Sequence, residues 1–213
     1  MPKKPWPTKK SMTQVYELHL WGGTDYDFYS GYGSHEQELI QPYIDVMISL
    51  LSSFDKLLTV CDLGCGDFNV AKHLVPYSHT YKAVDIVEEL ISRNRSQFCS
   101  ENLEFICLDL AKDELPKGDC AILRHVLQHL SNKEVGLILE KLNQYKSVII
   151  TDHIPKGEFE PNIDIISGQG TRLKIKSGLD VEAPLFDFKF REKKHLLSLN
   201  DQHGLIRTTL YYM

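Results

Sequence analysis

An aspartate and two spaced glycines follow an apolar run in the segment V-C-D-L-G-C-G-D-F, which occupies residues 60–68. The run L-L-T-V-C at residues 57–61 predicts a buried parallel strand, because such strands are apolar almost throughout. Gly64 and Gly66 then allow a turn tight enough for backbone N–H groups to approach a ligand. We expect a helix from Phe68 to Val75, whose first amides face that ligand. The segment therefore predicts an α/β domain with a nucleotide-like cofactor over the turn.

The carboxylate of Asp62, at the end of this strand, restricts the kind of cofactor. A dinucleotide-binding turn has the pattern G-x-G-x-x-G and packs a pyrophosphate against the helix, but Asn69 stands at the third glycine position. A carboxylate there repels a pyrophosphate and attracts an ammonium or sulfonium group. The pattern thus argues against a nicotinamide-dependent oxidoreductase, which remains the weaker alternative.

The same segment resembles motif I of the class I (Rossmann-like) S-adenosylmethionine-dependent methyltransferases, whose form is an apolar strand followed by D-L-G-C-G-x-G. Phe68 stands where that motif has its last glycine. The resemblance implies S-adenosyl-L-methionine as the cofactor, bound by Asp62, Gly64, Cys65 and Gly66.

Two further apolar runs, residues 79–84 and 103–108, are each followed by an aspartate, Asp85 and Asp109. Asp85 follows Gly66 by about 20 residues, the spacing at which an acidic side chain binds a ribose diol. In the family resembled, the third acid lies beside the adenine amino group. Aspartate also begins many loops for purely local reasons, but three successive strands with the same ending favour the cofactor interpretation. Further cofactor contacts are expected from Ile86, Leu110, Arg124, Trp21 and Tyr29.

The composition is that of one globular domain, and with the resemblance it implies a single methyltransferase domain over residues 1–213. The chain is 42% hydrophobic and 25% charged, and its net charge of −5 argues against general nucleic-acid binding. Five cysteines without a C-x-x-C pair predict small buried side chains in a reducing cytoplasm and no metal site. No run approaches the roughly 18 apolar residues of a membrane span. Four lysines and three prolines in residues 1–10 predict a flexible tail over residues 1–14.

The rest of the chain alternates between helix and strand patterns. We expect three helices: residues 36–54, which a Ser34–Gln37 capping box opens; residues 87–98; and a helix from a second capping box, Ser131–Glu134, to about residue 145. Strands are expected at residues 119–123, 147–151, 195–199 and 205–212. The last two strands form a hairpin like the one that closes the fold of the family resembled. The resemblance therefore implies a three-layer α/β sandwich with a mostly parallel seven-stranded sheet and an antiparallel C-terminal hairpin. Residues 152–191 are irregular and predict a loop on the acceptor side.

Residues 15–34 combine glycines with large aromatic rings, which suits a lid over a small ligand. The alternative is a fixed plug, with Trp21 filling a gap beside the sheet. The W-G-G pattern at residues 21–23 is similar to that of a group of small bacterial methyltransferases with no assigned acceptor.

Catalysis by in-line methyl transfer needs accurate positioning more than an acid or a base. His125, just after the fourth strand, can accept a proton if the acceptor must lose one. His153 is a second candidate, on the substrate side, whereas His129 is better explained as a structural residue. A metal held by His125 and His129 lacks a third ligand at a recognisable spacing. Arg172, in the irregular loop, either binds an anionic group of the acceptor or is a surface charge.

The sequence thus predicts methyl transfer from S-adenosylmethionine to an unidentified small-molecule acceptor. A non-catalytic S-adenosylmethionine-binding protein is the main alternative. The oligomeric state and the atom that is methylated stay open.

Overall fold

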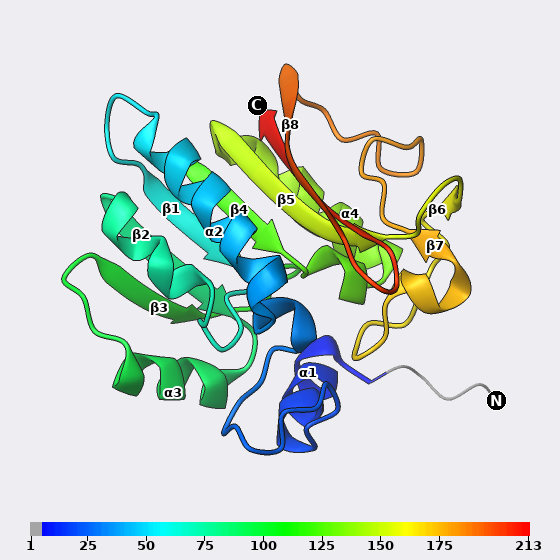
Figure 1. Ribbon diagram of the computed structural model, residues 1–213, viewed down its shortest axis with the longest axis horizontal. Coiled ribbons are helices and arrows are strands. Elements are labelled where there is room, and N and C mark those ends of the chain that lie inside the picture. The colour runs from blue at the N-terminus through cyan, green and yellow to red at the C-terminus, as the bar shows by residue number, and fades with distance from the viewer. Residues whose placement is uncertain (1–5) are drawn as a thin grey trace.

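Seven strands form one sheet in the computed structural model, which describes residues 6–213 (Figure 1). Across the sheet they are β3 (Leu103–Cys107), β2 (Thr80–Asp85), β1 (Thr59–Leu63), β4 (Cys120–Arg124), β5 (Ser147–Ile154), β9 (Leu205–Tyr212) and β8 (Glu192–Asn200). The first five are parallel, and β9 is antiparallel to both of its neighbours. The predicted mostly parallel seven-stranded sheet with a C-terminal hairpin is confirmed.

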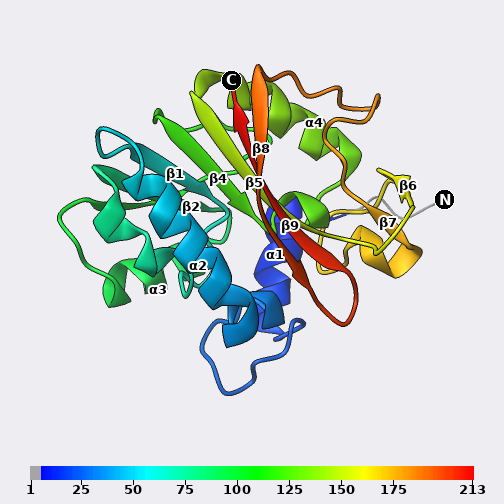
Figure 2. The same ribbon diagram turned by 45° about the horizontal axis from the view of Figure 1, so that its top comes forward.

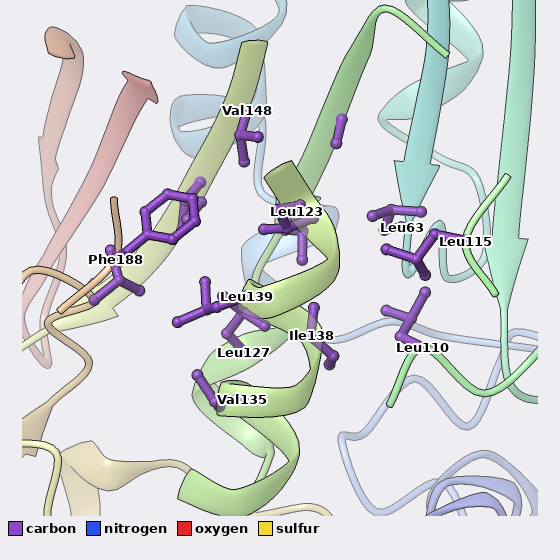
Figure 3. Packing of buried hydrophobic residues seen from close by; sticks show 14 of the residues in the cluster. Leu63, Leu110, Leu115, Leu123, Leu127, Val135, Ile138, Leu139, Val148 and Phe188 are labelled. Atoms are coloured by element: carbon purple, nitrogen blue, oxygen red, sulfur yellow. The ribbon is translucent and has the colours of Figure 1, made fainter. Parts of the chain in front are cut away.

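Helices cover both faces of this sheet (Figure 2). On one face lies α2 (Gln37–Ser52), whose buried side chains recur at helical spacing and pack on the central strands. Ile91 of α3 (Glu88–Gln97) belongs to the same buried cluster. On the other face α4 (Asn132–Lys141) packs Val135, Ile138 and Leu139 against Leu123 of β4 (Figure 3). The two apolar clusters pack the helices onto the sheet, and the paired parallel strands end at one common edge.

The segment after β1 differs from its prediction. We expected a helix from Phe68 to Val75, but these residues form two short 3₁₀ turns, Ala71–His73 and Val75–Tyr77. Phe68 has a left-handed backbone, with φ of 65°, and its ring is buried against Tyr81 and Phe105. A bulky residue adopts this unfavourable conformation only where packing offsets its energetic cost, and the contacts with Tyr81 and Phe105 do so here.

The N-terminal prediction was also wrong in part. Residues 1–5 lie outside the described part of the chain, but the tail expected over 1–14 is helical from Thr8, where α1 (Thr8–Glu17) begins. Tyr16 of α1 packs against Val87 and Leu90, which explains why this polar segment is ordered. In Figure 1, α1 lies beyond the tips of β1 and β4.

Of the two predicted capping boxes, the structure confirms the N-cap of one. The Ser131 hydroxyl accepts a hydrogen bond from the Glu134 backbone N–H at 3.4 Å and opens α4 as expected. In contrast, α2 begins after Glu36, and the Ser34 side chain provides no cap. Between β5 and β8 the chain is mostly irregular, with a short pair of β6 (Glu160–Pro161) and β7 (Ser177–Gly178) and a 3₁₀ turn at Arg172–Ile175. None of the helices within residues 6–213 combines the length and the apolar character that crossing a membrane requires.

Candidate active site

A cavity of about 660 Å³ lies at the carboxyl ends of the parallel strands. This edge is where open α/β sheets bind their ligands. One part of the wall comes from the β1 turn and the ends of β2 and β3, and another from the ends of β4 and β5 and the β8–β9 hairpin. The predicted site residues found in its lining are Trp21, Asp62, Gly64, Cys65, Gly66, Asp85, Ile86, Asp109, Leu110, Arg124, His125 and His153.

The turn after β1 presents its backbone differently from our expectation. Every backbone N–H from Gly64 to Asn69 donates to an acceptor inside the protein; Gly64 and Cys65, for example, both donate to Val84 O at 2.8 Å. The turn therefore offers the ligand no row of amide donors, and no helix dipole points at it. The glycines provide space instead: with φ of 98° and 55°, a Cβ at Gly64 or Gly66 would overlap Val126 or Ser30.

Buried carboxylates give this wall its charge. Asp85 accepts hydrogen bonds from Gly66 N and Val87 N, both at 3.1 Å, and each of its oxygens keeps a lone pair for a further donor. Burial raises the pKa of Asp85 and raises that of Asp62 to about 7. A wall with acceptors and negative charge suits a ligand that carries hydroxyl, ammonium or sulfonium groups.

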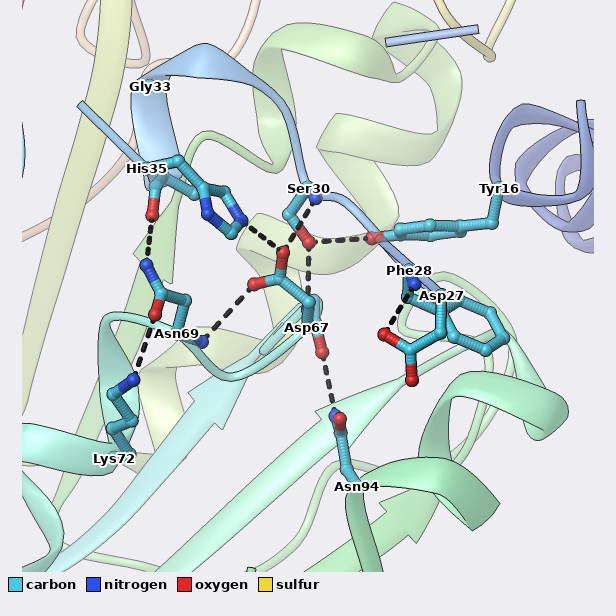
Figure 4. Close-up of polar contacts among 12 residues, drawn as sticks. Tyr16, Asp27, Phe28, Ser30, Gly33, His35, Asp67, Asn69, Lys72 and Asn94 are labelled. Carbon is cyan, nitrogen blue, oxygen red and sulfur yellow. Dashed lines mark hydrogen bonds and ion pairs between the residues drawn. The ribbon is translucent and has the colours of Figure 1, made fainter. Parts of the chain in front are cut away.

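Asp67 forms the polar centre of this wall, and sequence analysis did not single it out (Figure 4). Its carboxylate accepts hydrogen bonds from Ser30 N at 2.8 Å and Asn69 N at 3.2 Å, and it lies 2.6 Å from His35 Nε2. The Ser30 hydroxyl in turn accepts from Asp67 N at 2.7 Å and contacts the Tyr16 hydroxyl at 3.1 Å. Asp67 thereby fixes the segment before α2 against the turn.

Residues 21–34, which combine aromatic rings with glycines, cover the cavity, and we call this segment the roof. Arg124 donates to Ser34 Oγ at 3.1 Å and to Gly33 O at 2.5 Å, so it holds the roof to the sheet. Trp21 lines the cavity and packs against the His129 ring, 5.0 Å between centroids. Tyr29, in contrast, packs on His35 and lies outside the lining, so the structure gives its predicted cofactor contact no support.

Two hydrogen bonds, one in each direction, join this roof to the irregular loop after β5. Trp21 Nε1 donates to Gln169 O at 3.2 Å, and Gln169 Nε2 donates to Leu20 O at 2.5 Å. The cavity is therefore covered from two sides by segments that are distant in sequence.

Histidines dominate the part of the cavity beside β4, β5 and the hairpin, which we call the histidine chamber: His125, Gln128, His129, His153, Asp201 and His203. His125 has φ of 58°, and burial lowers its pKa well below the usual histidine value. Its Nε2 has no hydrogen-bond partner in the part of the chain that the structure describes. His153 Nε2 lies 3.5 Å from an Asp201 carboxylate oxygen.

Arg172 does not lie in this chamber, and its predicted contact with the acceptor is wrong. The residue is 1% exposed, and its guanidinium donates to Leu130 O at 2.8 Å, Ile163 O at 3.1 Å and Asn132 Oδ1 at 2.6 Å. Buried guanidinium groups require such partners. Arg172 therefore organises the loop that covers the chamber.

Metal binding finds no support within residues 6–213, where no group of three or more potential ligands converges. Cys65 is the one predicted cysteine contact, and burial keeps its thiol protonated by raising its pKa.

Asp67, Gln128, Asp201 and His203 line the cavity but were not predicted as site residues, and Ser30 was expected only as part of the segment 15–34. The position of Asp67 directly after the two glycines was a usable signal. Gln128, Asp201 and His203 reach the chamber only through the tertiary fold, and their sequence context gave no comparable signal.

A family model described as a methyltransferase domain matches residues 32–147. The fold is similar to that of the N-methyltransferase NodS from Bradyrhizobium japonicum, solved with S-adenosyl-L-homocysteine (TM-score 0.66, 10% identity, 95% of this chain and 98% of that chain). It is also similar to magnesium protoporphyrin IX methyltransferase from Synechocystis, with a TM-score of 0.60 and 16% identity over 97% of this chain and 100% of that chain. Human N-acetylserotonin methyltransferase gives a TM-score of 0.57 and 19% identity over 97% of this chain and 60% of that chain. The chain thus spans 60% of the length of that human enzyme. None of the curated proteins compared with the chain matches it.

Proposed function

Because the chain belongs to the methyltransferase domain family, we propose that it transfers a methyl group from S-adenosylmethionine to a small-molecule acceptor. The observation that carries this proposal is the continuity of one cavity, which joins the carboxylate wall of the β1 turn to the histidine chamber. Two ligands bound there would meet at the carboxyl ends of β1 and β4. Structural neighbours solved with S-adenosylmethionine or S-adenosyl-L-homocysteine support the choice of cofactor.

The carboxylate wall fits this cofactor. S-adenosylmethionine supplies a methyl group on a positively charged sulfur, together with an ammonium group and a ribose diol. Asp85 would accept from the ribose hydroxyls with its remaining lone pairs, and Asp109 would lie at the adenine end, since it lines the cavity after β3. Asp62 is buried beneath the turn and would favour the cationic portion.

The chain's contribution to the chemistry would be positioning and proton removal. The roof and the loop cover the cavity from two sides. The strand ends would hold the two ligands in line, which can supply several kcal/mol of the barrier. His125 would accept a proton from the acceptor, because its Nε2 is unpaired within residues 6–213 and its ring is neutral near pH 7.

Titration calorimetry with S-adenosylmethionine, S-adenosyl-L-homocysteine and NAD tests the cofactor. We expect binding of the first two and none of NAD. Asp85→Asn should weaken binding by about 1–3 kcal/mol, since one acceptor becomes a donor. Binding of NAD alone would overturn the proposal.

A matched glycine pair tests where the cofactor lies. Gly66→Ala introduces a Cβ that overlaps Ser30, so it should abolish binding or reduce it strongly. Gly136→Ala serves as the control, because its Cβ would meet open space on α4 and should leave affinity unchanged. Turnover is tested with methyl-labelled S-adenosylmethionine and a metabolite extract, by mass spectrometry. Cofactor binding without a labelled product would favour the non-catalytic alternative.

A further inference from the structure

The Gln128 side chain lies between three histidines of the chamber. Its Oε1 accepts from the His153 backbone N–H at 2.9 Å and lies 3.3 Å from His125 Nδ1. Its Nε2 lies 3.3 Å from His129 Nε2. The side chain is 8% exposed, so these contacts form away from solvent.

The backbone N–H of His153 fixes which end of the Gln128 amide carries the oxygen. An N–H group can only donate, so the atom that it meets must be the carbonyl oxygen. A rotated amide would place its NH₂ group against this N–H, with two donors facing each other in a buried site. The geometry therefore assigns the amide without reference to the histidine protons.

The amide orientation then fixes the proton on each neighbouring ring. A carbonyl oxygen only accepts, so His125 Nδ1 must carry the hydrogen. His129 Nδ1 lies 3.1 Å from Gly170 O and must also carry a hydrogen, which leaves its Nε2 to accept from the Gln128 amide. Both rings are satisfied in the neutral form, in agreement with the lowering of both pKa values by burial.

In His125 this arrangement leaves the lone pair at Nε2. That atom is buried, its ring lines the cavity, and no partner for it exists among residues 6–213. Buried polar atoms are rarely left unpaired, which points to a ligand group at this position. Since a lone pair only accepts, the ligand group must be a hydrogen-bond donor.

We propose that Gln128 is a positioning residue that holds His125 as a proton acceptor, and that the methyl acceptor presents a hydroxyl group to His125 Nε2. This inference rests on the proposed function. A hydroxyl is favoured over an ammonium group because two cationic side chains also line the cavity, Arg124 and Lys174. Their positive charges disfavour a second cation beside His125. In the reaction the hydroxyl oxygen forms a bond to the methyl carbon, the carbon–sulfur bond breaks with its electron pair moving to sulfur, and the hydroxyl proton passes to His125 Nε2. The products are a methyl ether and S-adenosyl-L-homocysteine.

Nitrogen NMR of the full chain, labelled at histidine, tests the positioning role. In the unmodified protein we expect a protonated, pyrrole-type Nδ1 and a pyridine-type Nε2 for His125. Gln128→Met removes the acceptor and should shift His125 toward the Nε2–H form. Gln128→Glu keeps an acceptor oxygen beside His125 Nδ1 and should retain the original pattern of His125. Its second oxygen replaces the donor to His129, so His129 should gain a proton at Nε2. An Nε2–H form in the unmodified protein, or an unchanged pattern in Gln128→Met, would overturn the positioning role.

The hydroxyl assignment is tested with S-adenosylmethionine that carries a ¹³C-labelled methyl group, incubated with a metabolite extract. The carbon shift of the transferred methyl group distinguishes a methoxy product from N-, S- or C-methyl products. We expect a methoxy signal, with its rate reduced at least about tenfold in Gln128→Met and largely retained in Gln128→Glu. An N-, S- or C-methyl signal contradicts the hydroxyl assignment.

Failure of the proposed function itself gives a different result. In that case S-adenosyl-L-homocysteine does not bind in calorimetry, or no methyl group is transferred, whatever the NMR pattern shows. Unchanged affinity for S-adenosyl-L-homocysteine in both Gln128 variants verifies that they remain folded.

Discussion

Asp67 and Ser30 exchange two hydrogen bonds across 37 residues of sequence: Ser30 N donates to Asp67 Oδ2 at 2.8 Å, and Asp67 N donates to Ser30 Oγ at 2.7 Å. Ser30 belongs to the roof of the cavity and Asp67 to the turn beneath it. The pair therefore couples the position of the roof to the part of the turn that faces the cofactor.

Asp67→Ala should release this coupling. It removes the acceptor for Ser30 N and the partner of His35, so the free energy of unfolding should fall by about 1–3 kcal/mol. Hydrogen exchange measured by mass spectrometry should show faster exchange in residues 26–35. Asp55→Ala, at an exposed position, is the control and should leave that segment unchanged. Equal exchange in both variants would mean that packing alone holds the roof.

Cofactor binding should change the exchange of the roof more than that of the sheet. If residues 21–34 act as a lid, their amides exchange in the free protein and become protected when S-adenosyl-L-homocysteine is added. The hydrogen bonds from Trp21 to the Gln169 carbonyl and from Arg124 to Gly33 would then have to open for the ligand to enter. Identical protection with and without the ligand would show that the segment is a fixed plug.

Arg172→Met should destabilise the protein without acting on the acceptor directly. The substitution leaves Leu130 O and Ile163 O without their buried donor, at an expected cost of about 2–5 kcal/mol. Lys174→Met is the control, because Lys174 is an exposed residue of the same 3₁₀ turn. Urea unfolding of both variants measures the difference. A small loss for Arg172→Met, similar to that of the control, would contradict the structural role.

Asp152→Asn should change how stability depends on pH. Burial raises the pKa of Asp152 to about 7, although Arg172 and Arg207 act in the opposite direction, and its Oδ1 has no partner within residues 6–213. Between pH values of about 4 and 7 the unfolded chain has lost this proton and the folded protein has kept it, so the free energy of unfolding falls as the pH rises. The asparagine variant does not titrate.

The stability of Asp152→Asn relative to the unmodified protein should therefore increase from a pH of about 4 to about 7 and then level off. Urea unfolding at several pH values measures this difference. A constant difference over the whole range would show that the pKa of Asp152 is not raised in the folded state.

The seven strands of the sheet and the helices α2, α3 and α4 were predictable from local patterns. Buried parallel strands are apolar almost throughout, so β1 and β4 are visible in the sequence without any knowledge of their neighbours. The aspartates that follow such strands mark the edge where ligands bind, which is why Asp85 and Asp109 were expected there and are found in the cavity wall.

The features that were not predicted depend on contacts between residues that are distant in sequence. Phe68 leaves the helical conformation because Tyr81 and Phe105, on two other strands, form the pocket for its ring. Arg172 resembles any surface arginine until the carbonyl of Leu130 is brought to it. Local patterns contain no information about such pairings, so the helix at Phe68 and the exposed Arg172 were both mistaken.

The insertion of β9 between β5 and β8 has a consequence for synthesis of the chain. β5 pairs with β4 on one side, but its other side pairs with residues 205–212, which are made much later. Until then a strand that is mostly buried in the finished protein presents an unpaired edge. Such edges pair readily with other chains, so slow translation between β5 and β9 would expose the nascent protein to aggregation. The hairpin that lines the histidine chamber also covers the edge of β5 in the finished sheet.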